Sequence, residues 1–186
     1  MLTGKLVRLR RWEPTDIDLA LKWMNDPEVT YWLAARYPIS RPEEEAWLHR
    51  SSNRQPGDGI GFAIETIAEG RHIGSTGLHQ WRQENRTAEL GIQIGEKDFW
   101  GRGYGTDAMV TLLRFGFDEM NLNRVSLLVL AENARGIAAY RKCGFVEEGR
   151  LREEWYQRGR YHDLLVMGVL AAEFRAMHPL EDPVEA

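Results

Sequence analysis

The sequence predicts a single-domain α/β protein of the α+β type, in which one mixed sheet of six or seven strands carries helices on both faces. Three observations lead to this prediction. The chain has 186 residues, which suits one domain. Segments with alternating apolar residues are interspersed with segments whose apolar residues recur at helical spacing. The sequence contains no repeat, low-complexity block or linker, so residues 1–186 are expected to form one domain, with an ordered core over about 5–172 and a C-terminal tail beyond.

Composition favours a folded protein of the cytoplasm. Hydrophobic residues make up 43% of the chain and the formal net charge is −4, which argues against nucleic acid as a partner. Cys143 is the single cysteine, so an intrachain disulfide is excluded and a reducing compartment is expected. Residues 1–14 have no apolar stretch of the secretory type, and no apolar run approaches the roughly 18 residues that cross a bilayer. We therefore expect a cytoplasmic protein that neither binds nucleic acid nor enters a membrane.

The first third of the chain predicts one strand and two helices. Residues 5–10 alternate loosely between apolar and basic side chains, as in a short strand. A helical pattern follows over residues 15–24 and ends before the sequence Asn-Asp-Pro. A second helix is predicted after Ser40, which can serve as its N-cap. Pro42 would stand in the first turn of this helix, and the glutamates of residues 43–45 would lie near the positive end of its dipole, where negative charge is stabilising.

The middle of the chain predicts three strands. Residues 61–67 and 71–81 form two of them, joined by the turn sequence Ala-Glu-Gly. In the third strand, over residues 87–95, alternate apolar residues share one face, and Glu89 lies in the middle of the opposite face.

The remainder predicts two helices and three strands. Apolar residues at helical spacing follow Gly105 over several turns. Residues 123–131 form a strand that is buried on both faces. Asn133 caps a helix that ends at Gly144, a left-handed cap position. Two strand-like segments then flank a turn at residues 157–160.

The segment 96–109, with the sequence EKDFWGRGYGTDAM, has three glycines just before a predicted helix. A nucleotide P-loop is excluded, because no Lys-Ser or Lys-Thr pair follows the last glycine. Gly103 to Ala108 match the dinucleotide fingerprint G-x-G-x-x-A, but this segment does not follow directly on a strand, and Glu132, the nearest strand-end acid, lies too far along the chain. The third interpretation is a pyrophosphate cradle, in which backbone N–H groups of residues 102–106 point at the anion with help from the helix dipole.

Two segments resemble signatures of the GNAT N-acetyltransferases. The acetyl-CoA loop of that family resembles residues 88–108, AELGIQIGEKDFWGRGYGTDA, and its later Asn…Tyr…Gly-Phe signature resembles residues 132–145, ENARGIAAYRKCGF. The resemblance covers most of the chain and is strongest to the branch of ribosomal-protein N-terminal acetyltransferases and spermidine acetyltransferases. It implies the GNAT fold, with a central sheet splayed near Glu89, and acetyl-CoA as the cosubstrate.

Two departures from the family pattern bear on the ligands. Trp100 stands where many members begin the loop with Gln or Arg, although the branch also accepts an aromatic residue there. In the spermidine enzymes, acidic residues follow the pair that corresponds to Tyr31 and Trp32. Here Leu33 and the Ala-Ala-Arg sequence of residues 34–36 follow, which argues against polyamine binding.

The resemblance also assigns roles to individual residues. Tyr140 would protonate the departing thiolate, since a phenol of pKa about 10 can donate to a sulfur of pKa about 8.5. Glu89 would take the proton of the attacking ammonium, directly or through water. Free backbone groups of the splayed strand would bind the pantetheine arm and polarise the thioester carbonyl. The expected cofactor-binding residues are Ile92, Gln93, Ile94, Trp100, Gly101, Arg102, Gly103, Tyr104, Gly105, Thr106 and Asn133.

Each of these roles has a structural alternative. Asn133 suffices as a plain helix cap, Tyr140 as an amphipathic core tyrosine, and Glu89 as a solvated residue on an exposed strand face. The five histidines lack zinc-type spacing, so no metal is expected. Cys143, directly before Gly144, is expected to be packed rather than nucleophilic.

The predicted function is transfer of acetyl from acetyl-CoA to a primary amine by direct attack, without an acyl-enzyme. The acceptor is a protein N-terminus, a polyamine or a small amine, which the sequence does not distinguish. The alternative is an acyl-CoA-binding sensor or interaction module that has lost turnover. Trp23, Trp32 and Trp47 are candidates for the acceptor pocket, for the core, or for the contact of a homodimer.

Overall fold

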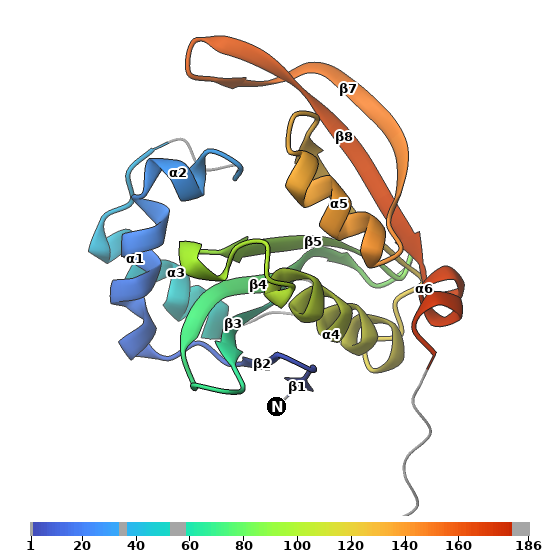
Figure 1. Ribbon diagram of the computed structural model, residues 1–186, viewed down its shortest axis with the longest axis horizontal. Helices are drawn as coiled ribbons and strands as arrows, with labels where there is room; N and C mark the ends of the chain where they lie inside the picture. The colour runs from blue at the N-terminus through green and yellow to red at the C-terminus, as the bar shows by residue number, and fades with distance from the viewer. Residues whose placement is uncertain (1, 34–36, 53–58, 180–186) are drawn as a thin grey trace, which may run out of the picture.

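The computed structural model describes residues 2–33, 37–52 and 59–179 (Figure 1). Residues 34–36, whose lack of acidic side chains argued against polyamine binding, and the last residues of the expected C-terminal tail, 180–186, lie outside the described part. The strands are β1 (Leu2–Thr3), β2 (Val7–Arg10), β3 (Ile60–Thr66), β4 (His72–Arg82), β5 (Thr87–Ile94), β6 (Arg124–Leu130), β7 (Val146–Gln157) and β8 (Arg160–Leu170). The helices are η1 (Pro14–Asp16), α1 (Ile17–Met24), α2 (Pro27–Thr30), α3 (Arg41–Ser52), η2 (Lys97–Phe99), α4 (Tyr104–Asp118), α5 (Ala134–Lys142) and α6 (Ala171–Met177).

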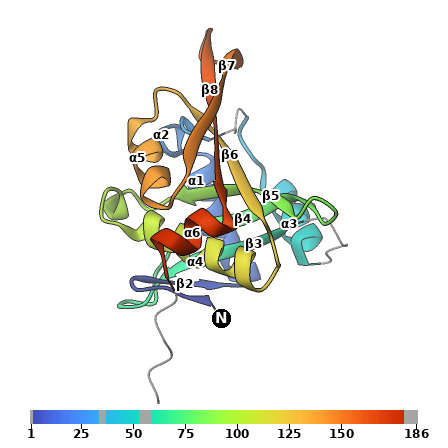
Figure 2. The same cartoon turned by 90° about the vertical axis from the view of Figure 1, so that its right-hand side faces the viewer.

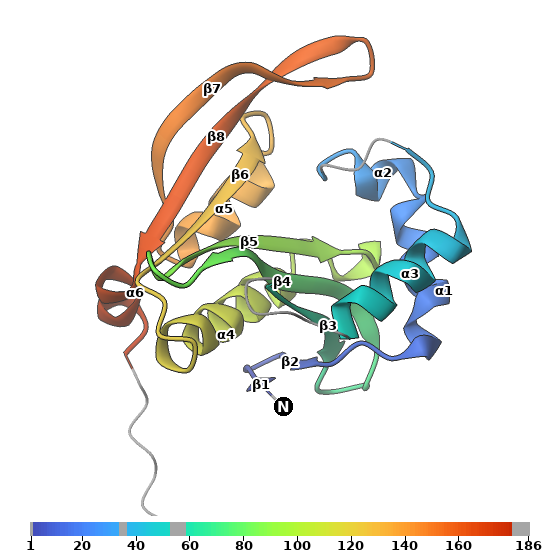
Figure 3. The same cartoon turned by 180° about the vertical axis from the view of Figure 1, so that it is seen from behind.

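All the described strands belong to one mixed sheet in the order β1-β2-β3-β4-β5-β6-β8-β7. Every neighbouring pair is antiparallel except β5 and β6, which run parallel. These two strands pair only at their beginnings, where Thr87–Glu89 face residues 124–126. Beyond Glu89 they separate, and the β6–β8–β7 part of the sheet rises away from β5 (Figures 1 and 3). The splay expected near Glu89 is therefore confirmed.

Helices cover both faces of the sheet, as predicted. α4 lies against the face that Figure 1 presents, and α3 lies on the opposite face, which Figure 3 presents. One face of α4 is buried, with Met109, Leu112, Leu113 and Phe117 in the main core. On the other side of the sheet, α1 and α3 pack against each other. The sheet is consequently buried between two helical layers in its β3–β5 half.

The structure corrects three details of the sequence analysis. The described sheet has eight strands instead of six or seven, because the short edge strand β1 pairs with β2 and had no sequence pattern of its own. β6 is buried on one face only, and Leu128 on its other face is 45% exposed, because the splay leaves that face uncovered. The packed chain also runs past residue 172, since α6 buries Phe174 against Phe117 (Figure 2).

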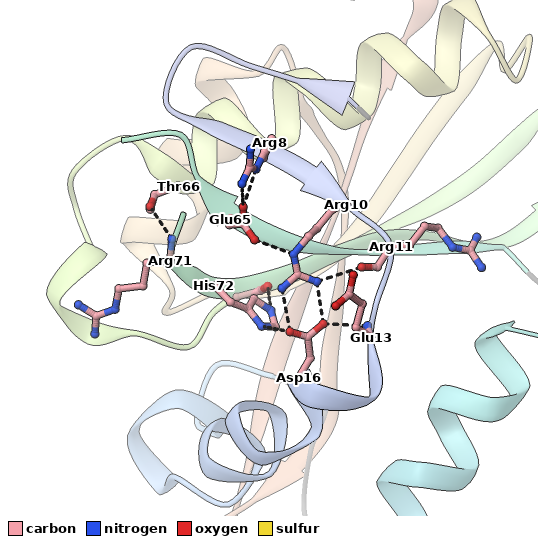
Figure 4. A network of polar contacts seen from close by, with 10 residues as sticks. Arg8, Arg10, Arg11, Glu13, Asp16, Glu65, Thr66, Arg71 and His72 are labelled. Atoms are coloured by element: carbon pink, nitrogen blue, oxygen red, sulfur yellow. Dashed lines mark hydrogen bonds and ion pairs between the residues drawn. The ribbon is translucent and has the colours of Figure 1, made fainter. Parts of the chain in front are cut away.

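A buried ionic network fixes the position of α1 relative to the sheet (Figure 4). Arg10 on β2 donates to both carboxylate oxygens of Asp16, at 2.7 and 2.8 Å, and through Nε to Glu65 on β3 at 2.7 Å. The Nδ1 atom of His72 lies 3.0 Å from Asp16, and its Nε2 atom lies 2.9 Å from the carbonyl of Gly74. The network therefore joins three strands to the start of α1.

A second buried carboxylate joins α1 to the end of β5. Glu96 accepts hydrogen bonds from Trp23 at 2.9 Å and from Lys22 at 2.7 Å, both on α1, and from Arg71 at 2.7 Å. Trp23 packs against Gly95, where the space leaves no room for a side chain. These contacts place the wall formed by α1 beside the splayed end of β5. Among the described helices, none has the length and apolar character needed to span a membrane.

Candidate active site

The glycine loop between η2 and α4 adopts a conformation that favours glycine. Gly101 has φ +72° and Gly103, the N-cap of α4, has φ +90°. In the first turn of α4, the carboxylate of Asp107 accepts backbone N–H bonds from the chain between β1 and β2, including one of 2.7 Å from Leu6. The start of α4 is thus held against β2, with its free N–H groups and positive dipole end directed at the loop. The role of Asp107 was not predicted from the sequence.

A cavity of about 320 Å³ lies in the splay of the sheet, between β5, the glycine loop and α5. The open edge of β5 forms one wall of the cavity and helix α5 forms another, so a ligand can lie between the separated parts of the sheet. The lining residues are Val29, Trp32, Leu33, Ile92, Gln93, Ile94, Phe99, Trp100, Gly101, Gly103, Gly105, Thr106, Met109, Asn133, Arg135, Gly136, Ala138, Ala139, Tyr140 and Lys142.

The fold brings most of the predicted site residues to this one cavity. The exceptions are Glu89, Arg102 and Tyr104. The Arg102 guanidinium lies over the rings of Phe99 and Tyr104, at 5.6 and 5.8 Å, and donates to the carbonyl of Asp98. The side chains of Arg102 and Tyr104 therefore pack on the loop itself and do not line the cavity.

The backbone of β5 presents fewer free groups to the cavity than the sequence analysis expected. The indole of Trp100 donates to the carbonyl of Ile94 at 2.7 Å, so this carbonyl faces the open edge and is already paired. Because successive residues of a strand direct their backbone groups to opposite edges, Ile92 faces the same open edge and Gln93 faces β4, opposite Ser75. The free groups at the open edge are thus the N–H of Ile94 and both groups of Ile92.

Two basic residues of α5, which sequence reasoning missed, also line the cavity. Arg135 lies over the ring of Trp100 at 4.1 Å, and Lys142 stands two turns further along the helix. Their charges can bind phosphate groups together with the N-terminal end of α4. The signal available in the sequence was the basic character of the α5 segment, ARGIAAYRK.

Tyr140 and Asn133 occupy the two ends of α5. Asn133 caps the helix, since its Oδ1 atom accepts the N–H of Gly136 at 2.9 Å, and it also lines the cavity. Tyr140 packs edge-on against Phe145 and turns toward the cavity. Among the described residues its hydroxyl has no hydrogen-bond partner. Burial, and to a smaller degree the neighbouring Cys143, raises the pKa of Tyr140 to about 12, so the phenol keeps its proton at neutral pH.

Glu89 lies at the fork of the sheet, opposite Ser126 on β6 and His79 on β4. Its carboxylate accepts a hydrogen bond of 3.2 Å from Gln80 and is not among the residues that line the cavity. The nearby ring of His79 lies over Gly91. Burial lowers the pKa of His79, and the charge of Glu89 opposes this effect, so the imidazole is neutral at pH 7.

A second cavity, of about 560 Å³, adjoins the first on the α1–α3 side of the sheet. The two cavities share Leu33, Ile92 and Gln93, which therefore form their common wall. Trp12 and Trp47, from the N-terminal third of the chain, line this second cavity, which we call the aromatic cavity. Its further lining residues are Met24, Tyr37, Pro38, Ile39, Glu43, Gly61, Ser75, Thr76, Gly77, His79 and Gly91.

Cys143 takes no part in this site. Cys143 is fully buried, and burial raises the pKa of its thiol to about 12, which leaves it unreactive at neutral pH. No group of three His, Cys, Asp or Glu side chains with metal-binding geometry occurs within the described residues.

Three features of this site are typical of an acyltransferase that uses a coenzyme A thioester. They are the splayed sheet, the left-handed glycine loop at the start of α4, and the basic cavity between them. The chain belongs to the GNAT acetyltransferases, because a model of the acetyltransferase (GNAT) domain matches residues 7–146.

Individual relatives extend over nearly the whole chain. YdaF of Bacillus subtilis (strain 168), which carries the name of a ribosomal N-acetyltransferase, is 31% identical over 171 residues, which cover 90% of this chain and 93% of YdaF. The spermidine N(1)-acetyltransferase of Vibrio cholerae serotype O1 is 30% identical over 149 residues, covering 78% and 82% of the two chains.

A solved structure agrees with these relatives. The crystal structure of spermidine N-acetyltransferase from Vibrio cholerae in complex with CoA and spermine superposes with a TM-score of 0.82 at 27% identity, over 90% of this chain and 97% of that one. The protein is an acetyl-CoA-dependent N-acetyltransferase that transfers acetyl to an amine, and both the GNAT fold and the acetyl-CoA prediction are confirmed.

Proposed function

We propose that acetyl-CoA occupies the cavity in the splay and that the acceptor amine reaches it from the aromatic cavity on the α1–α3 side. The observation that carries this proposal is the wall that the two cavities share, formed by Leu33, Ile92 and Gln93. An amine held on one side of this wall lies next to a thioester held on the other. Direct attack then needs no acyl-enzyme, because positioning supplies much of the rate.

The cofactor is held by backbone and basic groups. The N–H groups of Ile92 and Ile94 face the open edge of β5, where they bind the pantetheine arm and polarise the thioester carbonyl. The pyrophosphate lies on the loop from Gly101 to Thr106, at the N-terminal end of α4. Arg135 and Lys142 bind the remaining phosphate.

The proton transfers are assigned to Tyr140 and Glu89. Tyr140 donates to the thiolate as it leaves, which is supported by its unpaired hydroxyl, its raised pKa and its place in the cavity wall. Glu89 lies outside both cavities, so it receives the amine's proton through water. The neutral ring of His79, which lines the acceptor cavity opposite Glu89, is the natural intermediate in that path.

The acceptor class, assembly and compartment extend this proposal. One relative is named for ribosomal N-acetylation and another for spermidine, so we propose a protein N-terminus, a polyamine or a small amine as the acceptor. A homodimer is supported by the projecting β7–β8 hairpin, which exposes Tyr156 and Tyr161 (Figure 2). The acidic net charge disfavours nucleic acid, and the single cysteine favours the cytoplasm.

One experiment tests the function. Purified protein is mixed with acetyl-CoA and a panel of amines and N-terminal peptides, and released thiol is measured against acetyl-CoA alone. We expect amine-dependent thiol release with at least one class of acceptor. Tight binding of acetyl-CoA without thiol release for any acceptor would favour the acyl-CoA-sensor alternative.

A further inference from the structure

Glu44 is a buried carboxyl group without a partner. The first turns of α3 carry three consecutive glutamates. Glu43 accepts hydrogen bonds from the backbone and hydroxyl of Ser40, and Glu45 is exposed near Arg41. Glu44 instead turns inward and is 8% exposed. Within the described ranges, no hydrogen bond or ion pair reaches its carboxyl.

Burial of a carboxyl group without a neighbouring cation disfavours its charged form. Burial raises the pKa of Glu44, and no neighbouring cation opposes the effect. Buried polar side chains in folded proteins are paired in the great majority of cases, and an unpaired one calls for an explanation such as a catalytic role or a bound water or ion. The missing partner of Glu44 is therefore expected to be a ligand.

The surroundings of Glu44 specify the chemistry of that ligand. Glu44 lines a cavity of about 690 Å³ whose walls include Trp12, Trp23 and Trp47. The rings of Trp12 and Trp47 meet edge to face at 5.3 Å. An ammonium group pairs with a carboxylate and is attracted to the faces of indole rings, whereas an anion or a neutral apolar group would leave the carboxyl unpaired.

This cavity adjoins the proposed acceptor cavity along several residues and meets the cofactor cavity at Gln93 alone. Both are lined by Trp12, Trp47 and Gln93. The cofactor cavity shares only Gln93 with the cavity around Glu44. A cation bound at Glu44 is consequently a different group from the amine that attacks at the common wall.

We propose that Glu44 binds an ammonium group of the acceptor that is separate from the amine that is acetylated. The acceptor is then a diamine, with one amine at Gln93 and the second, charged amine among the tryptophans. This inference rests on the proposed use of the aromatic cavity for the acceptor. In this arrangement Glu44 on α3 provides an acidic group, whereas in the spermidine enzymes acidic residues follow the pair that corresponds to Tyr31 and Trp32.

The test compares 1,5-diaminopentane with pentylamine, which differ only in the second ammonium group. Their binding to the protein loaded with CoA is measured by titration calorimetry and by tryptophan fluorescence, for the wild type, Glu44→Gln and Glu45→Gln. We expect the wild type to bind the diamine at least about tenfold more tightly than the monoamine. Glu44→Gln should weaken diamine binding by about 10- to 100-fold, leave pentylamine unchanged and melt no lower than the wild type. The exposed neighbour variant Glu45→Gln should match the wild type throughout.

Equal affinity for the two amines, no binding of either, or a preference that survives in Glu44→Gln would overturn the inference. Lower stability of Glu44→Gln with both affinities reduced alike would also overturn it, because the carboxyl would then serve the fold. These measurements use CoA and need no turnover. A diamine preference without thiol release from acetyl-CoA would therefore contradict the proposed catalysis alone, and thiol release without the preference would contradict the role of Glu44 alone.

Discussion

Tyr140 can act as an acid because of where α5 places it. Its hydroxyl has no protein partner among the described residues, and its pKa of about 12 keeps the proton in place well above neutral pH. We predict that Tyr140→Phe, which keeps the ring and its packing on Phe145, lowers kcat by about 10- to 100-fold with little change in acetyl-CoA affinity. Steady-state kinetics and calorimetry measure the two effects separately.

The pH dependence gives a second readout for Tyr140. A raised pKa means that the acid form persists until the pH approaches 12, so the alkaline side of the wild-type profile should show no loss from this group below about pH 10. A variant with unchanged kcat, when chemistry limits the rate, would leave Tyr140 as a packing residue.

Gly103 has a left-handed backbone and lies on the loop that we propose as the pyrophosphate site. Its φ of +90° strains any L-residue, and a Cβ atom added here would have only Leu6 nearby, at 3.6 Å. Gly103→Val should therefore fold, but the added side chain should intrude on the pyrophosphate and weaken acetyl-CoA binding by at least about tenfold. Calorimetry measures the affinity.

Gly159 provides the matched control. It has φ +81° and lies in the β7–β8 turn, with nothing within 4 Å of an added side chain. Gly159→Val carries a similar backbone penalty, of the order of 1–3 kcal/mol, without touching the cofactor loop. Wild-type affinity in a folded Gly103→Val variant would place the phosphate cradle elsewhere.

At the scale of elements, the attachment of α1 to the sheet depends on Asp16. Its carboxylate is 4% exposed and accepts two hydrogen bonds from Arg10. Removing one partner of a buried pair leaves the other uncompensated, so we predict that Asp16→Asn lowers the free energy of unfolding by about 3–5 kcal/mol. Asp118, paired with Arg175 at the surface, is the control, and Asp118→Asn should cost at most about 1 kcal/mol. Denaturant unfolding measures both values.

The ionic network around Arg10 predicts that the folded protein loses stability in acid. Burial works to raise the pKa of Asp16 and Glu65, but hydrogen bonds from Arg10 lower both pKa values overall. A carboxyl with a lowered folded-state pKa contributes stability that is present above its unfolded pKa of about 4 and is lost as the pH falls through the folded value. The melting temperature should fall steeply below about pH 4, and less steeply in Asp16→Asn. An equal acid slope in the variant would contradict this origin.

For the whole molecule, the cofactor cavity lies between two parts of a splayed sheet, so its ligand should stabilise the entire fold. We predict that acetyl-CoA raises the melting temperature, with a stabilisation of about 2.7 kcal/mol at a concentration 100-fold above its Kd, whereas NAD and ATP have little effect. Thermal melts with each ligand are the measurement. An equal shift with NAD would restore the dinucleotide interpretation of the glycine loop.

Much of this architecture was predictable from local sequence. Helix α4, strand β5 and the α5 cap at Asn133 follow from side-chain period and capping chemistry, which act over a few residues. The positive φ values of Gly101 and Gly103 suit the phosphate cradle proposed for the loop, and Tyr140 lines the cavity in the splay. By contrast, β1 is too short to carry a pattern, and residue period could not show that the splay uncovers one face of β6.

The sequence by itself determined the class of protein, because the glycine loop and the Asn…Tyr…Gly-Phe segment are each continuous in the chain. Only the tertiary structure decided which residues line the proposed acceptor cavity and which polar groups are already paired. Trp100 donates to the carbonyl of Ile94, Asp107 accepts the backbone N–H of Leu6, and Glu44 lines a cavity beside three tryptophans. The physical reason is that burial and pairing depend on residues distant in the chain, so three consecutive glutamates with one local pattern acquire three different environments.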